Sequence, residues 1–60
     1  MSIKEAQELI EGDRITVLTL SEKRVIKGVF VKFNISSGNI YYLEHGEKKC
    51  AYLLGVKKVV

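Results

Sequence analysis

The sequence predicts a mainly β fold, in which a short N-terminal helix precedes a five-stranded, strongly bent small barrel. From Arg14 onward the chain consists of runs rich in β-branched and aromatic residues. Turn residues interrupt these runs about every 8 to 12 positions, as in small barrels and sandwiches. The 60 residues form one domain, residues 1–60. Because so short a chain has a small core, closing the sheet or pairing strand edges between subunits would stabilise it.

Residues 2–11 are expected to form the helix. Ser2 and Glu5 have the spacing of a capping box, in which each side chain bonds the backbone N–H of the other residue. Apolar residues then recur at helical spacing, and Gly12 fits the position directly after a helix end. Those apolar residues are Ile3, Ala6, Leu9 and Ile10.

The strands are expected at residues 14–20, 24–34, 39–44, 48–54 and 56–60. The second is apolar on both faces, and no helix remains to cover it, so we expect it to bend from one sheet into another. Gly28 gives that corner room for a close backbone approach or a bulge. His45 and Gly46 are expected to form a two-residue hairpin turn, with Gly46 at positive φ.

The charge is distributed unevenly along the chain. Residues 1–22 hold two basic and five acidic side chains, whereas residues 23–60 hold eight basic and two acidic ones. The net charges of the two segments are therefore −3 and +6, and that of the chain is +3. The basic segment is compatible with a phosphate-rich or acidic partner. The alternative is a solvated lysine surface that protects strand edges from aggregation.

We expect no enzymatic activity, no metal site and no cofactor. Ser36 and Ser37 have no base beside them, and the single histidine, His45, and single cysteine, Cys50, lack the spacing of metal ligands. No apolar stretch approaches the roughly 18 residues that a membrane span needs. A lone thiol without a recognisable targeting segment favours a reducing, cytoplasmic location.

The order of these elements resembles the Sm-like family of small barrels (Sm, Lsm and the bacterial Hfq proteins). The stretch "AQELIEGDRITVLTL" is similar to the family's helix, glycine and alternating strand, Gly28 matches its bent second strand, and Asn39-Ile40 matches the end of its binding loop. The resemblance covers nearly the whole chain. It implies RNA binding, and assembly into rings through the fourth and fifth strands. Src-homology-type barrels share the outline without the RNA pocket.

The chain departs from the family pattern around the loop. Asn34 replaces an aspartate, and Leu54-Gly55 replaces an Arg-Gly pair. Family members stack a base on two side chains, and the corresponding residues here are Gly38 and Leu54. Tyr41 and Tyr42 point to opposite faces of their strand, so one of them is expected near exposed lysines. The residues that we expect to bind nucleic acid are Asn34, Asn39, Lys32, Lys48, Lys49 and Tyr42, with Gly28 and Gly55 as structural positions.

Two hypotheses about function follow. The first is a small Sm-like barrel that binds RNA or another nucleic acid through its lysine-rich surface, as a homo-oligomer assembled through its C-terminal strands. The second is a protein-interaction module or small regulator that docks on a larger intracellular machine, without binding nucleic acid.

Overall fold

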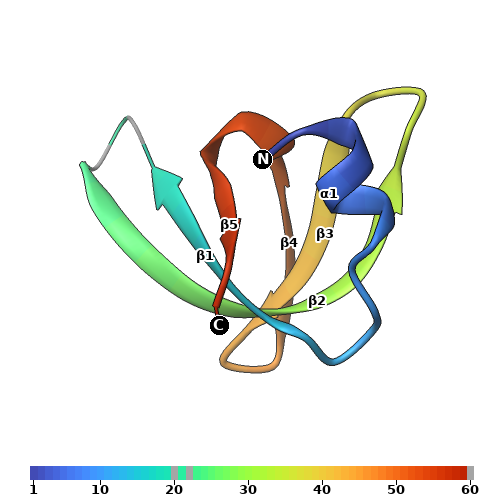
Figure 1. Cartoon of the computed structure of the whole chain (residues 1–60). Coiled ribbons are helices and arrows are strands. Elements are labelled where there is room, and N and C mark those ends of the chain that lie inside the picture. Colours follow the sequence, from blue (N-terminus) through green and yellow to red (C-terminus); the bar gives the residue numbers. More distant parts are fainter. Residues whose placement is uncertain (20, 22, 60) are drawn as a thin grey trace.

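The computed structural model describes residues 1–19, 21 and 23–59 (Figure 1). Within these residues, a short helix is followed by one antiparallel sheet with the strand order β4-β3-β2-β1-β5. The elements are α1 (Ile3–Gln7), β1 (Arg14–Thr19), β2 (Arg24–Asn34), β3 (Asn39–Glu44), β4 (Glu47–Tyr52), the 3-10 helix η1 (Leu53–Gly55) and β5 (Val56–Lys58). Leu20 and Val60, which the sequence predicts at the ends of strands, lie outside the described residues.

The prediction of a mainly β fold is confirmed. In the described residues β4 and β5 are the two edge strands of the sheet. The backbone pairings join β1 to β2, β2 to β3, β3 to β4 and β1 to β5. Closure of the sheet into a barrel therefore stays a prediction. The sheet is nevertheless strongly bent, because β2 sweeps as one long arc beneath the other elements (Figure 1).

The helix is shorter than the sequence predicts, because other partners bind the backbone after Gln7. Ser2 and Glu5 do form the reciprocal capping box. The backbone N–H of Ile10 then donates to the carboxylate of Asp13 at 2.9 Å, and that of Gly12 donates to the carbonyl of Phe30 at 2.9 Å. Gly12 does have a positive φ of 100°, but it lies in the turn that leads into β1 and not directly after the helix.

The core lies on the concave side of the sheet, where α1 and η1 cover it. Ala6 and Leu9 contribute the apolar side of the N-terminal segment, and Leu53 contributes that of η1. The sheet contributes its buried residues Ile15, Val17, Ile26, Phe30, Ile40, Tyr42 and Val56. Ile3 and Ile10, which the sequence predicts on the apolar stripe of the helix, are instead exposed, and Ile10 lies beyond the end of the helix.

A bulge in β2 divides this strand into two halves with opposite phase. Phe30 pairs with Tyr42 and Lys32 pairs with Tyr41, so Val31 is an extra residue with no partner in β3. Residues directly opposite each other in an antiparallel pair share a face. Phe33 therefore lies on the same face as Ile40 and packs against the core. The expectation of two buried faces is wrong, because Val25 and Val29 on the outer face are exposed.

Gly28 has the structural role that the sequence suggests, because it allows β3 to approach β2 closely. The bulge lies elsewhere in the strand, at Val31. A Cβ atom at Gly28 would lie 2.6 Å from Cδ2 of Tyr42 and 3.1 Å from the backbone oxygen of Leu43. The ring of Tyr42 thus occupies the space that a side chain at position 28 would need. Only glycine lets β3 pack its tyrosine against β2 at this point.

The turns and ends of the last strands differ in part from the expectation. His45 and Gly46 form the predicted two-residue turn, with φ angles of 52° and 82°, which are typical of a type I′ turn. Strand β4 ends at Tyr52 because the next three residues form η1. Gly55 ends that 3-10 helix, where a Cβ would lie 3.1 Å from the backbone oxygen of Leu18.

We expect the substitution Gly28→Ala to destabilise the fold, because the added methyl must displace the buried ring of Tyr42. The expected loss in the free energy of unfolding is about 1–3 kcal/mol, as for other overpacked cores. Urea unfolding followed by circular dichroism measures it. The matched control is Lys27→Ala on the same strand, whose exposed side chain should change the free energy by less than about 0.5 kcal/mol. Equal unfolding midpoints for Gly28→Ala and wild type would contradict the role given to Gly28.

Candidate nucleic-acid interface

The register of β2, β3 and β4 defines one continuous outer face, directed away from the core. Three rows of directly opposite residues run across these strands on this side. We call this set the outer face. Its rows are Asn34–Asn39–Tyr52, Lys32–Tyr41–Cys50 and Val29–Leu43–Lys48.

Four of the six residues that the sequence predicts to bind nucleic acid lie together on the outer face. Asn34 and Asn39 face each other at the loop end of the β2–β3 hairpin, and Lys32 lies two residues before Asn34. Lys48 lies at the opposite corner, beside Leu43. The bulge at Val31 produces this grouping, because it turns Lys32 and Asn34 outward and Phe33 inward.

Tyr42 cannot act as an exposed stacking surface, because its side chain lies in the core with 3% of its surface accessible. The same burial raises the pKa of its phenol above the ordinary value of 10.0. The tyrosine on the outer side of β3 is Tyr41. The ammonium of Lys32 lies 5.1 Å from the centroid of the Tyr41 ring, within the range of a cation–π interaction.

Lys49 also lies on the side of the sheet away from the outer face, where it is paired with Tyr42 of the neighbouring strand. Its ammonium donates a hydrogen bond of 2.6 Å to Oε1 of Glu44. This hydrogen bond lowers the pKa of the Glu44 carboxyl and raises that of the Lys49 ammonium. Lys49 is therefore engaged in an ion pair and is separated from the outer face by the thickness of the sheet.

The loop between β2 and β3 is held by its own polar side chains. Oδ1 of Asn34 accepts the backbone N–H of Ser36 at 3.0 Å, and Oγ of Ser37 accepts that of Asn39 at 3.3 Å. The backbone N–H of Gly38 donates to the carbonyl of Asn34 at 2.8 Å. The side-chain oxygen of Asn34 thus orders the turn, whereas the amide of Asn39 projects beside Tyr52 on the outer face.

Tyr52 is the residue that sequence reasoning did not select. Its ring packs against Gly38, where a Cβ would lie 2.6 Å from Cε1 of Tyr52, and 55% of the residue remains exposed. An aromatic ring therefore covers the loop glycine where the resemblance indicates a missing stacking residue. The register could have identified it: a two-residue turn at His45-Gly46 sets Glu44 opposite Glu47, and counting back from that pair sets Asn39 opposite Tyr52.

Leu54 and Gly55 lie in η1, apart from this face. Leu54 is exposed and lines a small pocket of about 160 Å³ with Leu18 and Val25. Its side chain therefore lies near the outer side of the β1–β2 hairpin.

Comparison with protein-family models, with curated proteins and with solved structures yields no significant match. The Sm-like resemblance accordingly depends on the residues of this chain alone. Among the described residues, none of the helices has the length and the apolar character needed to cross a bilayer. The same residues contain no cluster of three or more side chains suited to binding a metal ion.

We expect Lys49→Gln to move the pKa of the Glu44 carboxyl back toward the ordinary value of 4.5, because the lysine holds it lower. A carboxyl with a lowered pKa in the folded state stabilises the fold above its unfolded pKa. That contribution is lost as the pH falls through the lowered value. NMR titration of the Glu44 carboxyl measures the shift. An unchanged titration in Lys49→Gln would contradict the pairing, and Lys48→Gln, on the opposite face, is the control.

Proposed function

We propose that the chain binds single-stranded nucleic acid, RNA in the first place, across the outer face. The observation that supports this most is the grouping of two tyrosine rings, two lysines and two asparagines on one side of three strands. Proteins that bind single strands combine a positively charged surface with aromatic rings on which bases stack. The outer face offers both kinds of contact within three adjacent rows.

Each group on the outer face has a distinct role in this proposal. The exposed ring of Tyr52 stacks one base, supported from behind by Gly38. The amide of Asn39 beside it can both donate and accept hydrogen bonds at a base edge. Lys32 and Lys48 attract the phosphates, and Lys32 already lies over the Tyr41 ring, so its ammonium is positioned at a second stacking surface.

We also propose that the chain is an Sm-like small barrel that assembles with copies of itself through β4 and β5. These two strands are the edges of the sheet, and the family that the sequence resembles forms rings by pairing its fourth and fifth strands. Edge strands expose unpaired backbone groups that can pair with another chain. The strand order thus supports this proposal, because its two edge strands are the strands that the family uses for assembly.

The competing proposal is a protein-interaction module that does not bind nucleic acid. Leu18, Val25 and Leu54 are all exposed and line one pocket, an arrangement that suits an apolar side chain of a protein partner. Exposed apolar residues that cluster around one hollow are typical of interaction sites.

We expect the chain to bind a single-stranded oligonucleotide, with an affinity that decreases as salt is raised. Counterion release predicts a slope of log K against log salt of about −0.7 for each phosphate contacted. Fluorescence anisotropy with labelled oligouridine and oligoadenosine measures it over a salt series. Tyr52→Phe should retain the affinity. Tyr52→Leu, which keeps apolar packing over Gly38, should lose about 1–3 kcal/mol of binding free energy.

Two controls separate this proposal from general charge attraction. Lys32→Gln and Lys4→Gln remove the same charge, but only Lys32 lies on the outer face, whereas Lys4 lies on α1. We expect the first to weaken binding more than the second. Absence of binding to either oligonucleotide at low salt would reject the proposal in favour of the protein-interaction module.

We expect light scattering to give a solution mass that is a multiple of the 6.8 kDa chain. A single proline at an edge position, such as Cys50→Pro, should reduce this mass toward that of the monomer, because proline lacks the N–H that strand pairing uses. The matched control is Cys50→Ser. A wild-type chain that is monomeric at all concentrations would contradict assembly through the strand edges.

A further inference from the structure

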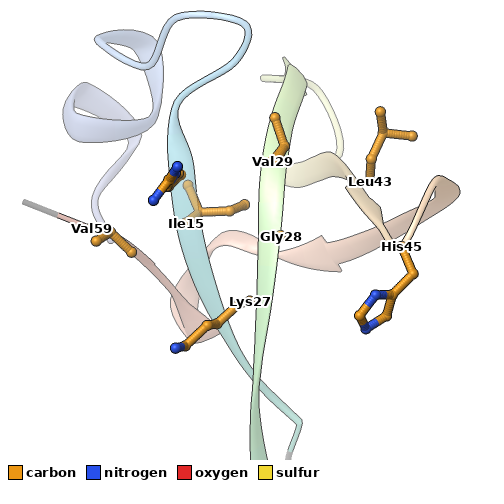
Figure 2. Close-up of a pocket in the computed structure, with 8 residues that line it drawn as sticks. Ile15, Lys27, Gly28, Val29, Leu43, His45 and Val59 are labelled. Carbon is orange, nitrogen blue, oxygen red and sulfur yellow. The ribbon is translucent and has the colours of Figure 1, made fainter.

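A groove of about 360 Å³ lies on the outer side of the sheet, over Val29 and Leu43 (Figure 2). It spans five segments, from the residue after β5, across β1, β2 and β3, to the turn after β3. Its volume is within the range of about 300–1,000 Å³ that small-ligand sites have. We call it the Val29 groove; it is lined by Arg14, Ile15, Lys27, Gly28, Val29, Leu43, His45 and Val59.

The floor of the Val29 groove is apolar. Val29 pairs with Arg14 on one side and with Leu43 on the other, so these three residues form one row across the sheet. Val59 closes the groove beyond β1, because its backbone N–H donates to the carbonyl of Arg14 at 2.9 Å. Ile15 and Gly28 contribute only their outward-facing backbone, since both are buried on the core side. The side chains of the floor are therefore those of Val29, Leu43 and Val59, all apolar.

The rim of the groove is basic. Arg14, Lys27 and His45 come from β1, β2 and the β3–β4 turn, and no acidic side chain lines the groove. The neighbouring acids have other partners, since Asp13 lies 3.6 Å from the ammonium of Lys58 and Glu44 is bound to Lys49. Within the described residues, no salt bridge involves Arg14, Lys27 or His45. The rim therefore provides positive charge for a ligand.

We propose that the Val29 groove binds one nucleotide, with its phosphate on Arg14 and Lys27 and its base on the apolar floor. A guanidinium and an ammonium suit a phosphate, because guanidinium forms paired hydrogen bonds and ammonium acts as a point charge. The valine and leucine side chains pack on a planar base. With Arg14 and Lys27 on the phosphate, His45 is the rim side chain left to hydrogen-bond a base edge, so the site distinguishes bases weakly.

The nucleotide can be free or can belong to a bound strand. Val29 and Leu43 belong both to the groove and to the outer face, so a strand that stacks on Tyr52 could continue across them. The groove can bind a free mononucleotide whether or not the outer face binds a strand. Binding of part of a strand in the groove rests on the proposed function and extends it.

Amide NMR titration of the full chain with adenosine monophosphate tests this site. We expect shifts concentrated at the amides of Arg14, Val29 and Leu43, and weaker binding of adenosine, which lacks the phosphate. Lys27→Gln should reduce the affinity at least about tenfold, as expected for the loss of a charged hydrogen bond. Lys4→Gln removes the same charge from α1 and should change the affinity by less than about twofold. Dispersed amide spectra verify that each variant is folded.

Two results would overturn the inference: no shifts at the groove amides with adenosine monophosphate, or equal losses for Lys27→Gln and Lys4→Gln.

A titration with oligouridine separates the two proposals. Oligouridine binding that depends on Tyr52, without any mononucleotide binding, rejects the groove and keeps the outer face. Mononucleotide binding that Lys27→Gln weakens, without oligouridine binding, keeps the groove and rejects the proposed function. If Lys27→Gln weakens both ligands, the groove also holds a nucleotide of the strand.

Discussion

The single extra residue in β2 determines which side chains are brought together on each side of the sheet. Without Val31 as an unpaired residue, Phe33 would point outward and Lys32 would point toward Ile40 and the core. The bulge reverses the alternation of inward and outward side chains after Phe30. Phe30 and Phe33 therefore both face the core, while Lys32 and Asn34 lie beside β3 on the outer face. A bulge also increases local twist, which agrees with the curvature of β2.

The chain uses the same packing arrangement twice, a tyrosine ring laid over a glycine. Tyr42 covers Gly28 inside the core, and Tyr52 covers Gly38 at the surface, each with a contact that would place a Cβ at 2.6 Å. The inner pair brings β3 against β2 and fixes the corner of the sheet. The outer pair supports one ring face with backbone and leaves the rest of the residue exposed. The same kind of contact between a tyrosine ring and a glycine thus stabilises the core in one place and supports a candidate binding surface in the other.

The sequence predicted those features that local chemistry decides. The capping box at Ser2 and the turn at His45-Gly46 depend on residues within a few positions, and Gly28 stood out because glycine is unusual in an apolar strand. The helix end was wrong because Phe30, distant in sequence, binds the N–H of Gly12. Tyr42 was assigned to the surface because strand alternation sets Tyr41 and Tyr42 on opposite faces without showing which of them faces the core. The choice between Tyr41 and Tyr42 therefore required the three-dimensional pairing.

The pairing of β1 with β5 joins residues that are 41 positions apart, whereas β2, β3 and β4 are joined by short hairpins. Closing so long a loop costs more chain entropy than forming a hairpin, so we expect β5 to be added after the hairpins during folding. Val59 follows β5 directly and forms one wall of the Val29 groove. That wall exists only when the end of the chain is docked, and any occupant of the groove adds its binding free energy to the docking of the last strand.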